Sequence, residues 1–280
     1  MNGWYPDKLF RYRRINTSYF DDELKHLREN KVWLNFLHTQ NDPFEGCVSN
    51  SVISYDYFLL RNKELREALK KNFPDLDPDL LPETIPRCHF DEYNLHSPCF
   101  HEKVRKRAVV ASFSKVWQNT LMWGHYADGF KGICLEFTAS PTVEVDGRPP
   151  FFPVQYWTEK PPEFSPFDFF VQMHLSAGVE RLEESKNRNA LENLAHEKIK
   201  LAATSKSFDW AYEQEFRMLS FIGEPGYYQV PGMKLTSIIF GPLEEGKDHS
   251  KIIDIFGQEI SYSKMKLDEN AYRYQLADYY

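Results

Sequence analysis

Residues 107–138 are the part of the chain that most constrains its fold, because three kinds of local order follow one another there without a break. Residues 108–113 form an apolar run with two adjacent valines, which is typical of a buried strand. Residues 115–127 contain no proline and no glycine before Gly124, so they can form a helix, and residues 131–138 are apolar again. The sequence therefore predicts a strand, a helix and a second strand in succession.

Two hydroxyl side chains, those of Ser112 and Ser114, lie at the end of the first of these strands. Because side chains alternate along a strand, both are expected on one face. Polar groups where a strand gives way to a loop often hold ligands, which makes both serines candidate binding residues. The structural alternative is that Ser114 caps the helix that follows.

The remaining elements are placed by hydrophobic periodicity and by proline and glycine. An opening strand is expected over residues 9–14, helices over 21–29 and 63–72, a short apolar segment over 31–36, and a helical region over 167–204 that could be two helices. Further strands are expected at 142–145, 154–157, 213–222, 227–230, 236–240, 259–267 and 272–276. Residues 74–86 carry four prolines, which excludes regular structure there.

These elements predict an α+β fold with a split, mainly antiparallel β-sheet and helical insertions. No Gly/Ser linker divides the 280 residues, so a single domain over residues 1–280 is expected. The helical insertions are placed at about residues 60–105 and 163–206.

Composition and charge narrow the class of protein. The net charge of −7 argues against a broad basic surface that follows a nucleic-acid backbone. No apolar run reaches the roughly 18 residues that a membrane-spanning helix needs. The four cysteines are scattered, and the first residues lack the basic start and apolar run of a signal peptide, so a reduced, cytoplasmic protein is expected. Residues 88–101 are dense in Cys and His, but their spacing matches no regular zinc pattern, and no metal site is expected.

A second group of candidate residues lies in the strand expected over residues 213–222. Alternation would place Glu213, Glu215 and Arg217 on one face. Two carboxylates spaced in this way can reach one small ligand, one to stabilise charge and the other as a base. The alternative is a solvated face on which Arg217 pairs with Glu215.

The order of these parts resembles the ADP-ribosyltransferase superfamily in its arginine, serine and glutamate class. Arg11 and Arg13 lie on the opening strand, Ser-Phe-Ser stands at residues 112–114, and Glu-Gln-Glu stands at residues 213–215. The resemblance implies a split sheet of ADP-ribosyltransferase type with nicotinamide adenine dinucleotide (NAD) held across it as substrate. Two departures are Phe113 at the centre of the serine motif, where the superfamily has threonine, and Arg14 after Arg13, which leaves Arg11 as a rival for the arginine role.

The chain is also similar, over nearly its full length, to the bacterial domain of unknown function family 2971. The shared motifs are Tyr12-Arg13, Asn-Asp-Pro-Phe-Glu at 41–45, Ser-Phe-Ser at 112–114, Met-Trp-Gly-His-Tyr-Ala at 122–127 with Lys131-Gly132, and Glu-Gln-Glu-Phe-Arg at 213–217. Asp42, Glu45 and His125 belong to this pattern and have no counterpart in the transferase motif. A structural role is the alternative for them, with Asp42 closing an Asx turn and His125 hydrogen-bonded in the core.

The transferase resemblance implies a role for each motif residue in the reaction. Glu215 would stabilise the oxocarbenium-like ribose that forms when nicotinamide leaves, and Glu213 would activate the accepting group. Arg13, or its rival Arg11, would pair with the pyrophosphate. Ser112 would orient the ribose or the glutamate, with Ser114 in support.

Aromatic residues complete the expected site. Tyr126 or Trp123 would stack on nicotinamide, although aromatic side chains on a helix more often belong to the core. Phe208, Trp210 and Tyr212 occupy the position of the loop that recognises the acceptor in such transferases, where flat rings can grip a base or an aromatic side chain.

The function expected from the resemblance is ADP-ribosyl transfer from NAD to a macromolecular acceptor, either protein or nucleic acid. A bacterial toxin or phage-defence effector, opposed by a neutralising partner, would use such an activity. Hydrolysis of NAD by the same residues is the first alternative. A non-catalytic nucleotide-binding or sensor module is the second, and a metal-dependent nuclease built on residues 88–101 is the last.

Overall fold

The structure is a computed structural model that describes residues 6–74, 77, 79–96, 100–139, 151–181, 186–221, 223–230, 232–246, 249–268, 270–271 and 273–278. Its strands are β1 (Lys8–Arg13), β2 (Lys31–Phe36), β3 (Ser49–Asn50), β4 (Val109–Ser114), β5 (Ile133–Ala139), β6 (Phe152–Pro153), β7 (Gln155–Trp157), β8 (Glu163–Phe164), β9 (Ser205–Ser207), β10 (Glu215–Ser220), β11 (Gly226–Gln229), β12 (Met233–Phe240), β13 (Ser261–Leu267) and β14 (Tyr274–Asp278). Its helices are α1 (Phe20–Arg28), α2 (Tyr55–Asn72), α3 (Arg87–His96), α4 (Phe100–Arg107), α5 (Thr120–Tyr126), α6 (Pro166–Arg181), α7 (Lys186–Ala203) and α8 (His249–Phe256), with short 3-10 helices η1 (Leu37–Thr39) and η3 (Phe208–Glu213).

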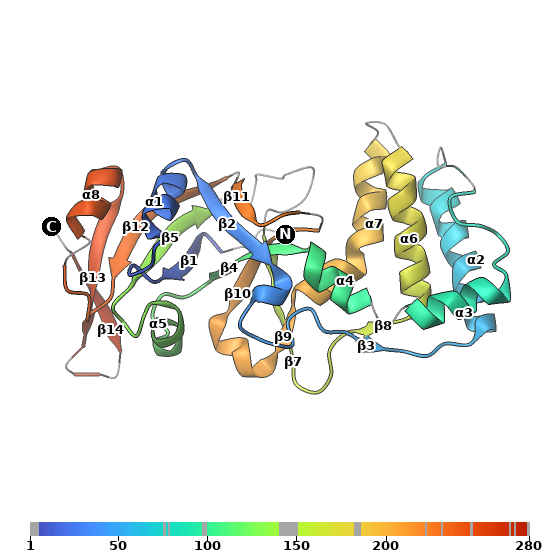
Figure 1. Ribbon diagram of the computed structural model, residues 1–280, viewed down its shortest axis with the longest axis horizontal. Coiled ribbons are helices and arrows are strands. Elements are labelled where there is room, and N and C mark those ends of the chain that lie inside the picture. Colours follow the sequence, from blue (N-terminus) through green and yellow to red (C-terminus); the bar gives the residue numbers. More distant parts are fainter. Residues whose placement is uncertain are drawn as a thin grey trace.

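The main sheet is open and mainly antiparallel, as the sequence predicts. Its strand order is β11-β2-β4-β1-β5-β12-β13-β14, with β10 added beside β4 and β6 beside β10, and its one parallel pair in the described chain is β12 with β13. Figure 1 shows this sheet in one half of the molecule and a group of helices, α2, α3, α6 and α7, in the other. Each half contains a hydrophobic cluster, and a further cluster joins Val110 of β4 to Phe169 of α6 and Ile199 of α7.

Strand β4 is the place where the sheet partly opens. On one edge β4 pairs with β10 along its whole length, from Ser114 opposite Glu215 to Val109 opposite Ser220. On the other edge β4 pairs with β1 at Ser114 and with β2 at Val109 and Val110. Among the described pairings, residues 111–113 have no strand partner on that second edge, and a hollow can form beside them.

The expected strand, helix and strand over residues 108–138 is confirmed, although its helix is shorter than predicted. α5 begins at Thr120, because the side chain of Asn119 caps it by accepting hydrogen bonds from the backbone N–H groups of Leu121 and Met122. Ser114 is therefore not the helix cap. Its hydroxyl instead accepts from the backbone N–H of Val116 and donates to the carbonyl of Glu213, 2.6 Å away.

The strand expected over residues 213–222 begins later than predicted, at Glu215. Glu213 ends the 3-10 helix η3, and Gln214 has a left-handed backbone conformation with φ of 45°. The alternation argument that put Glu213 and Glu215 on one strand face is thus wrong. A turn at Gln214, which is unusual for a residue other than glycine, brings the two carboxylates to the same place.

Other boundaries also shift. The helical region over 167–204 is two helices, α6 and α7, and the helix expected over 63–72 is the second half of the longer α2. The expected strand 154–157 is present as β7, whereas the strand expected over 142–145 lies outside the described residues. Within the described part of the chain, no helix has the length and apolar character required to cross a membrane.

Candidate functional site

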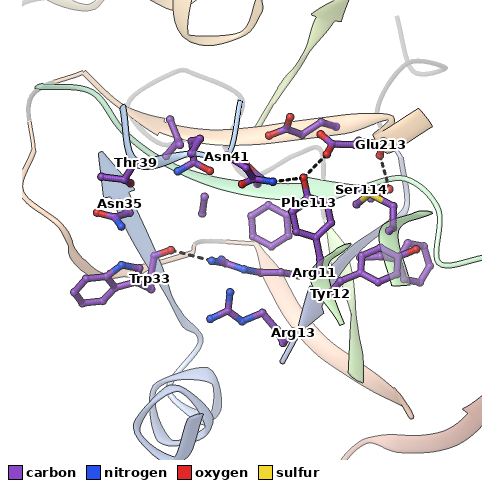
Figure 2. A pocket seen from close by; sticks show the side chains of 18 of the residues that line it. Arg11, Tyr12, Arg13, Trp33, Asn35, Thr39, Asn41, Phe113, Ser114 and Glu213 are labelled. Atoms are coloured by element: carbon purple, nitrogen blue, oxygen red, sulfur yellow. Dashed lines mark hydrogen bonds between the residues drawn. The ribbon is translucent and has the colours of Figure 1, made fainter. Parts of the chain in front are cut away.

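A pocket of about 810 Å³ lies beside the unpaired edge of β4, between that strand, β1 and β2. Its volume is within the range of ordinary ligand sites. The pocket brings together seven residues that the sequence singled out: Arg11, Arg13, Ser112, Ser114, Tyr126, Glu213 and Glu215. Figure 2 shows Arg11 and Arg13 near each other on one side of this pocket, with Glu213 on the other.

A buried cluster of charges forms the acidic end of the pocket. The ammonium group of Lys206 lies 2.6 Å from Glu213 Oε2, 3.3 Å from Glu215 Oε2 and 3.2 Å from Glu45 Oε1. All four side chains are at most 6% exposed. Because ions this deeply buried must be paired, the contacts of Lys206 with all three carboxylates help them to share one site.

Arg217 is the second buried cation of this cluster. Its guanidinium donates to both oxygens of Glu215, at 2.7 and 3.0 Å, and to Glu45 Oε1 at 2.7 Å. Its remaining Nη1 donates to the carbonyl of Ala203 at the end of α7. The solvated face considered for Arg217 and Glu215 is therefore wrong, since both side chains are buried.

The surroundings move the pKa values of Glu213 and Glu215 in opposite directions. Burial raises the pKa of Glu213, and the charge of Glu215 adds to the increase, which Lys206 only partly offsets. Burial would also raise the pKa of Glu215, but Arg217 and Lys206 outweigh it and, with the Ser112 hydroxyl, lower the pKa to about 2. Two neighbouring carboxyl groups with divergent pKa values are typical of acid–base sites.

Tyr126 holds Glu213 from the pocket side. Its hydroxyl donates a 2.6 Å hydrogen bond to Glu213 Oε1 and accepts one of 2.6 Å from the side-chain amide of Asn41. Burial and then the charge of Glu213 raise the pKa of Tyr126, so the phenol keeps its proton. The loop that contains Asn41 and Glu45 is thereby fixed to the acidic end through both residues.

The opposite end of the pocket is basic. Arg11 donates from Nη2 to the carbonyl of Trp33 at 3.1 Å, while its buried Nη1 has no hydrogen-bond partner among the described residues. Withdrawal from water, and then the neighbouring charge of Arg13, lower the pKa of Arg11 to about 10. Arg13 pairs with Glu23 at 2.6 Å, and its Nε likewise lacks a described partner. An anion bound between the two guanidinium groups would supply hydrogen-bond acceptors for both.

Comparison with protein families adds one finding to this geometry. Residues 122–218 match the model of a family described as protein of unknown function (DUF2971). The match supports the resemblance to the family of unknown function over that segment, which contains Tyr126, Lys206, Glu213, Glu215 and Arg217. Neither the curated proteins nor the solved structures compared with the chain gave a match.

Trp123, within the DUF2971 match, lies in the core and not on the pocket. It is fully buried, donates from its indole to the carbonyl of Trp117, and packs edge-on against Tyr12 at 5.4 Å between ring centroids. Of the two aromatic residues expected to stack on nicotinamide, Tyr126 alone lines the pocket in the described structure.

Three aromatic residues were expected to recognise an acceptor: Phe208, Trp210 and Tyr212. None of them is among the described residues that line the pocket. They belong to η3, where the side chain of Phe208 is 58% exposed. The ring of Trp210 lies 4.8 Å from the ammonium group of Lys206, and Tyr212 packs against the core around Trp123. Of the three rings, Trp210 therefore packs against the acidic cluster, at Lys206.

Three residues of the site had no predicted role. Lys206 is a single lysine in a polar segment, and no local pattern marks it. Asn41 and Glu45 lie in the loop of residues 41–45, outside the segment that matches the family. In this loop Asp42 closes the expected Asx turn by accepting a hydrogen bond from the N–H of Phe44 at 2.9 Å. The core position considered for His125 is wrong, because this residue is exposed.

The cysteine and histidine segment of residues 88–101 falls largely on α3 and α4. Among the described residues, no group of His, Cys, Asp and Glu side chains is arranged to hold a metal ion. Cys99 lies outside those residues.

Proposed function

We propose that this protein binds NAD in the pocket, breaks the bond between ribose and nicotinamide, and transfers ADP-ribose to a macromolecular acceptor. One observation carries the proposal: incompletely paired guanidinium groups at one end of a pocket face two carboxylates with opposite pKa shifts at the other. The pyrophosphate of a dinucleotide can bind the guanidinium groups, and its reactive ribose can lie at the carboxylates.

The chemistry assigns different work to the two carboxylates. The electron pair of the bond from C1′ to nicotinamide leaves with nicotinamide, and positive charge develops on the ribose. Glu215 is ionised at all ordinary pH values and would face this charge, although Arg217 and Lys206 neutralise much of its field. Glu213, with its raised pKa, would accept the proton of the attacking group as a new bond forms to C1′.

The sheet favours the same proposal. The edge of β4 that is unpaired over residues 111–113 carries Ser112 into the pocket, and β10 presents Glu215 from the other edge. This arrangement would suit the split sheet of an ADP-ribosyltransferase. In a bacterial cell the activity would suit a toxin or a phage-defence effector that a neutralising partner holds in check.

A second candidate is hydrolysis of NAD, and the position of η3 favours it. Phe208, Trp210 and Tyr212 do not line the pocket, so the rings expected to bind an acceptor are not on the pocket side of the carboxylates. Water needs no such surface. The same bond would break, and water would add to C1′ with loss of its proton to Glu213.

Incubation of the purified protein with NAD that carries a labelled ADP-ribose half tests both candidates. We expect nicotinamide release by the wild-type protein and a loss of about 100-fold or more for Glu213→Gln, which removes the base. The exposed Glu224→Gln is the matched control. Label bound to cell lysate macromolecules indicates transfer, whereas free ADP-ribose alone indicates hydrolysis. Binding of NAD without nicotinamide release, in the presence or absence of lysate, would leave a binding module and contradict both.

A further inference from the structure

Two aromatic rings form a wall of the pocket beside its basic end. Trp33 on β2 and Tyr227 on β11 are direct cross-strand partners, and their ring centroids lie 5.1 Å apart in an edge-to-face arrangement. Both line the pocket, and neither belongs to the motifs that the sequence singled out.

The sheet itself holds this wall open to the pocket. Along β2 the neighbours of Trp33, Val32 and Leu34, are buried in the core, while Trp33 alternates to the opposite face and stays 37% exposed. Tyr227 is supported from behind by His26, whose ring stacks on it at 3.7 Å with an interplanar angle of 25°. A large apolar ring left accessible in a polar pocket, on a supported wall, is a ready stacking surface.

The wall is joined directly to the candidate phosphate site. The backbone carbonyl of Trp33 accepts the hydrogen bond from Arg11 Nη2, which fixes the guanidinium beside the main chain of this residue (Figure 2). Asp22 also lines the pocket here and interacts with the Tyr227 hydroxyl, whose pKa burial and the charges of Glu23 and Asp22 raise to about 12. Aromatic rings beside guanidinium groups are the combination that binds a base and its phosphates together.

We propose that the Trp33–Tyr227 wall is the subsite for the adenine base of the substrate. The inference rests on the proposed function and sets the direction of the dinucleotide. Adenine stacks at the wall, the pyrophosphate lies on Arg11 and Arg13, and the nicotinamide ribose reaches Glu213 and Glu215. The opposite direction would place nicotinamide at the wall, away from the carboxylates that must act on its ribose.

Binding measurements with two overlapping fragments of the substrate test this direction on the full chain. ADP-ribose contains adenine and lacks nicotinamide, and nicotinamide mononucleotide has the reverse composition. We expect Trp33→Ala to weaken ADP-ribose binding in calorimetry by about 10-fold or more, the scale of one lost base stack, and nicotinamide mononucleotide binding by less than about twofold. Trp33→Phe keeps a flat ring and should recover most of the affinity. The exposed Tyr57→Ala on α2 is the control.

The outcomes separate this inference from the proposed function, because binding needs no catalysis. If Trp33→Ala weakens ADP-ribose binding selectively but the wild-type protein never releases nicotinamide, the adenine subsite is supported and the proposed catalytic function is refuted. The subsite would be overturned if Trp33→Ala weakened the binding of both compounds equally, weakened only that of nicotinamide mononucleotide, or weakened neither. This holds even if the wild-type protein releases nicotinamide. Should Trp33→Ala not fold, Trp33→Thr, with better strand propensity, allows the same comparison. Failure of the wild-type protein to bind ADP-ribose would also refute the subsite.

Discussion

Tyr126 and Glu213 share a 2.6 Å hydrogen bond in which the phenol donates to the carboxylate. Asn41 donates to the same phenol oxygen, so the Tyr126 proton is directed at Glu213. The bond partly offsets the burial that raises the pKa of Glu213, because it stabilises the ionised carboxylate. Tyr126 is thus placed to set both the orientation and the protonation of the proposed base.

Tyr126→Phe should therefore reduce nicotinamide release and shift its pH dependence. Loss of the donor raises the pKa of Glu213 further, so the acidic limb of the profile of kcat/KM against pH should move to higher pH. A hydrogen bond to a charged group is worth about 1.5–3 kcal/mol, which corresponds to a loss of roughly 10- to 150-fold if it is fully expressed in the transition state. Tyr57→Phe, on the exposed side of α2, is the control. An acidic limb that stays in place would show that Tyr126 does not act through Glu213.

Lys206→Met should destabilise the protein strongly. The substitution keeps most of the side-chain volume and leaves Glu213, Glu215 and Glu45 with only Arg217 to balance them. Removal of one partner from a buried ion cluster costs about 3–5 kcal/mol, whereas Lys198→Met at a partly exposed ion pair with Asp168 should cost less than about 1 kcal/mol. Urea denaturation of both variants measures the difference, and equal midpoints would show that the cluster carries no net stability.

The stability contributed by Glu215 should depend on pH in a defined direction. Its pKa falls from an ordinary value of 4.5 to about 2 on folding, so its ionisation stabilises the folded protein fully above pH 4.5. That contribution is lost as the pH falls toward 2. Glu215→Gln should therefore be less stable than the wild-type protein by up to about 3 kcal/mol at pH 6, with the gap narrowing below pH 4.5. Free energies of unfolding of both proteins from pH 6 to pH 3 provide the measurement. A gap that is constant over this range would contradict the lowered pKa.

Substitution of Arg11 and of Arg13, at the basic end, should have different effects on the stability of the protein. Arg11→Met should weaken ADP-ribose binding by about 10-fold or more through lost charge-assisted hydrogen bonds to phosphate, with little loss of stability. Arg13→Met should also lower the melting temperature, because Glu23, buried at 3% exposure, loses its 2.6 Å partner. Calorimetry and thermal unfolding of both variants, with the exposed Arg28→Met as control, separate the effects. Unchanged affinity in both variants would place the phosphates elsewhere.

The local elements were predictable because their signals are short-range. The apolar run of β4 marks a strand, its period of two carries Ser112 and Ser114 into the pocket, and the breaks between segments are set by proline, glycine and caps. Such signals failed at two residues. The Asn119 cap makes α5 shorter than predicted, and the left-handed conformation of Gln214 means that Glu213 is not part of the strand. Both depend on backbone conformations that side-chain periodicity does not report.

The sequence by itself determined most strands of the main sheet, its mainly antiparallel pairing, helices α1, α2, α5, α6 and α7, and a set of motif residues that meet at one pocket, but it did not predict α3, α4 or α8. Only the tertiary structure decided what surrounds those residues. Lys206 joins Glu45 from a distant loop to Glu213 and Glu215, Trp33 meets Tyr227 across the β2–β11 pairing, and Trp123 is buried in the core. Local sequence specifies which face a side chain takes, whereas charge pairing, burial and the resulting pKa values arise only when segments far apart in the chain pack together.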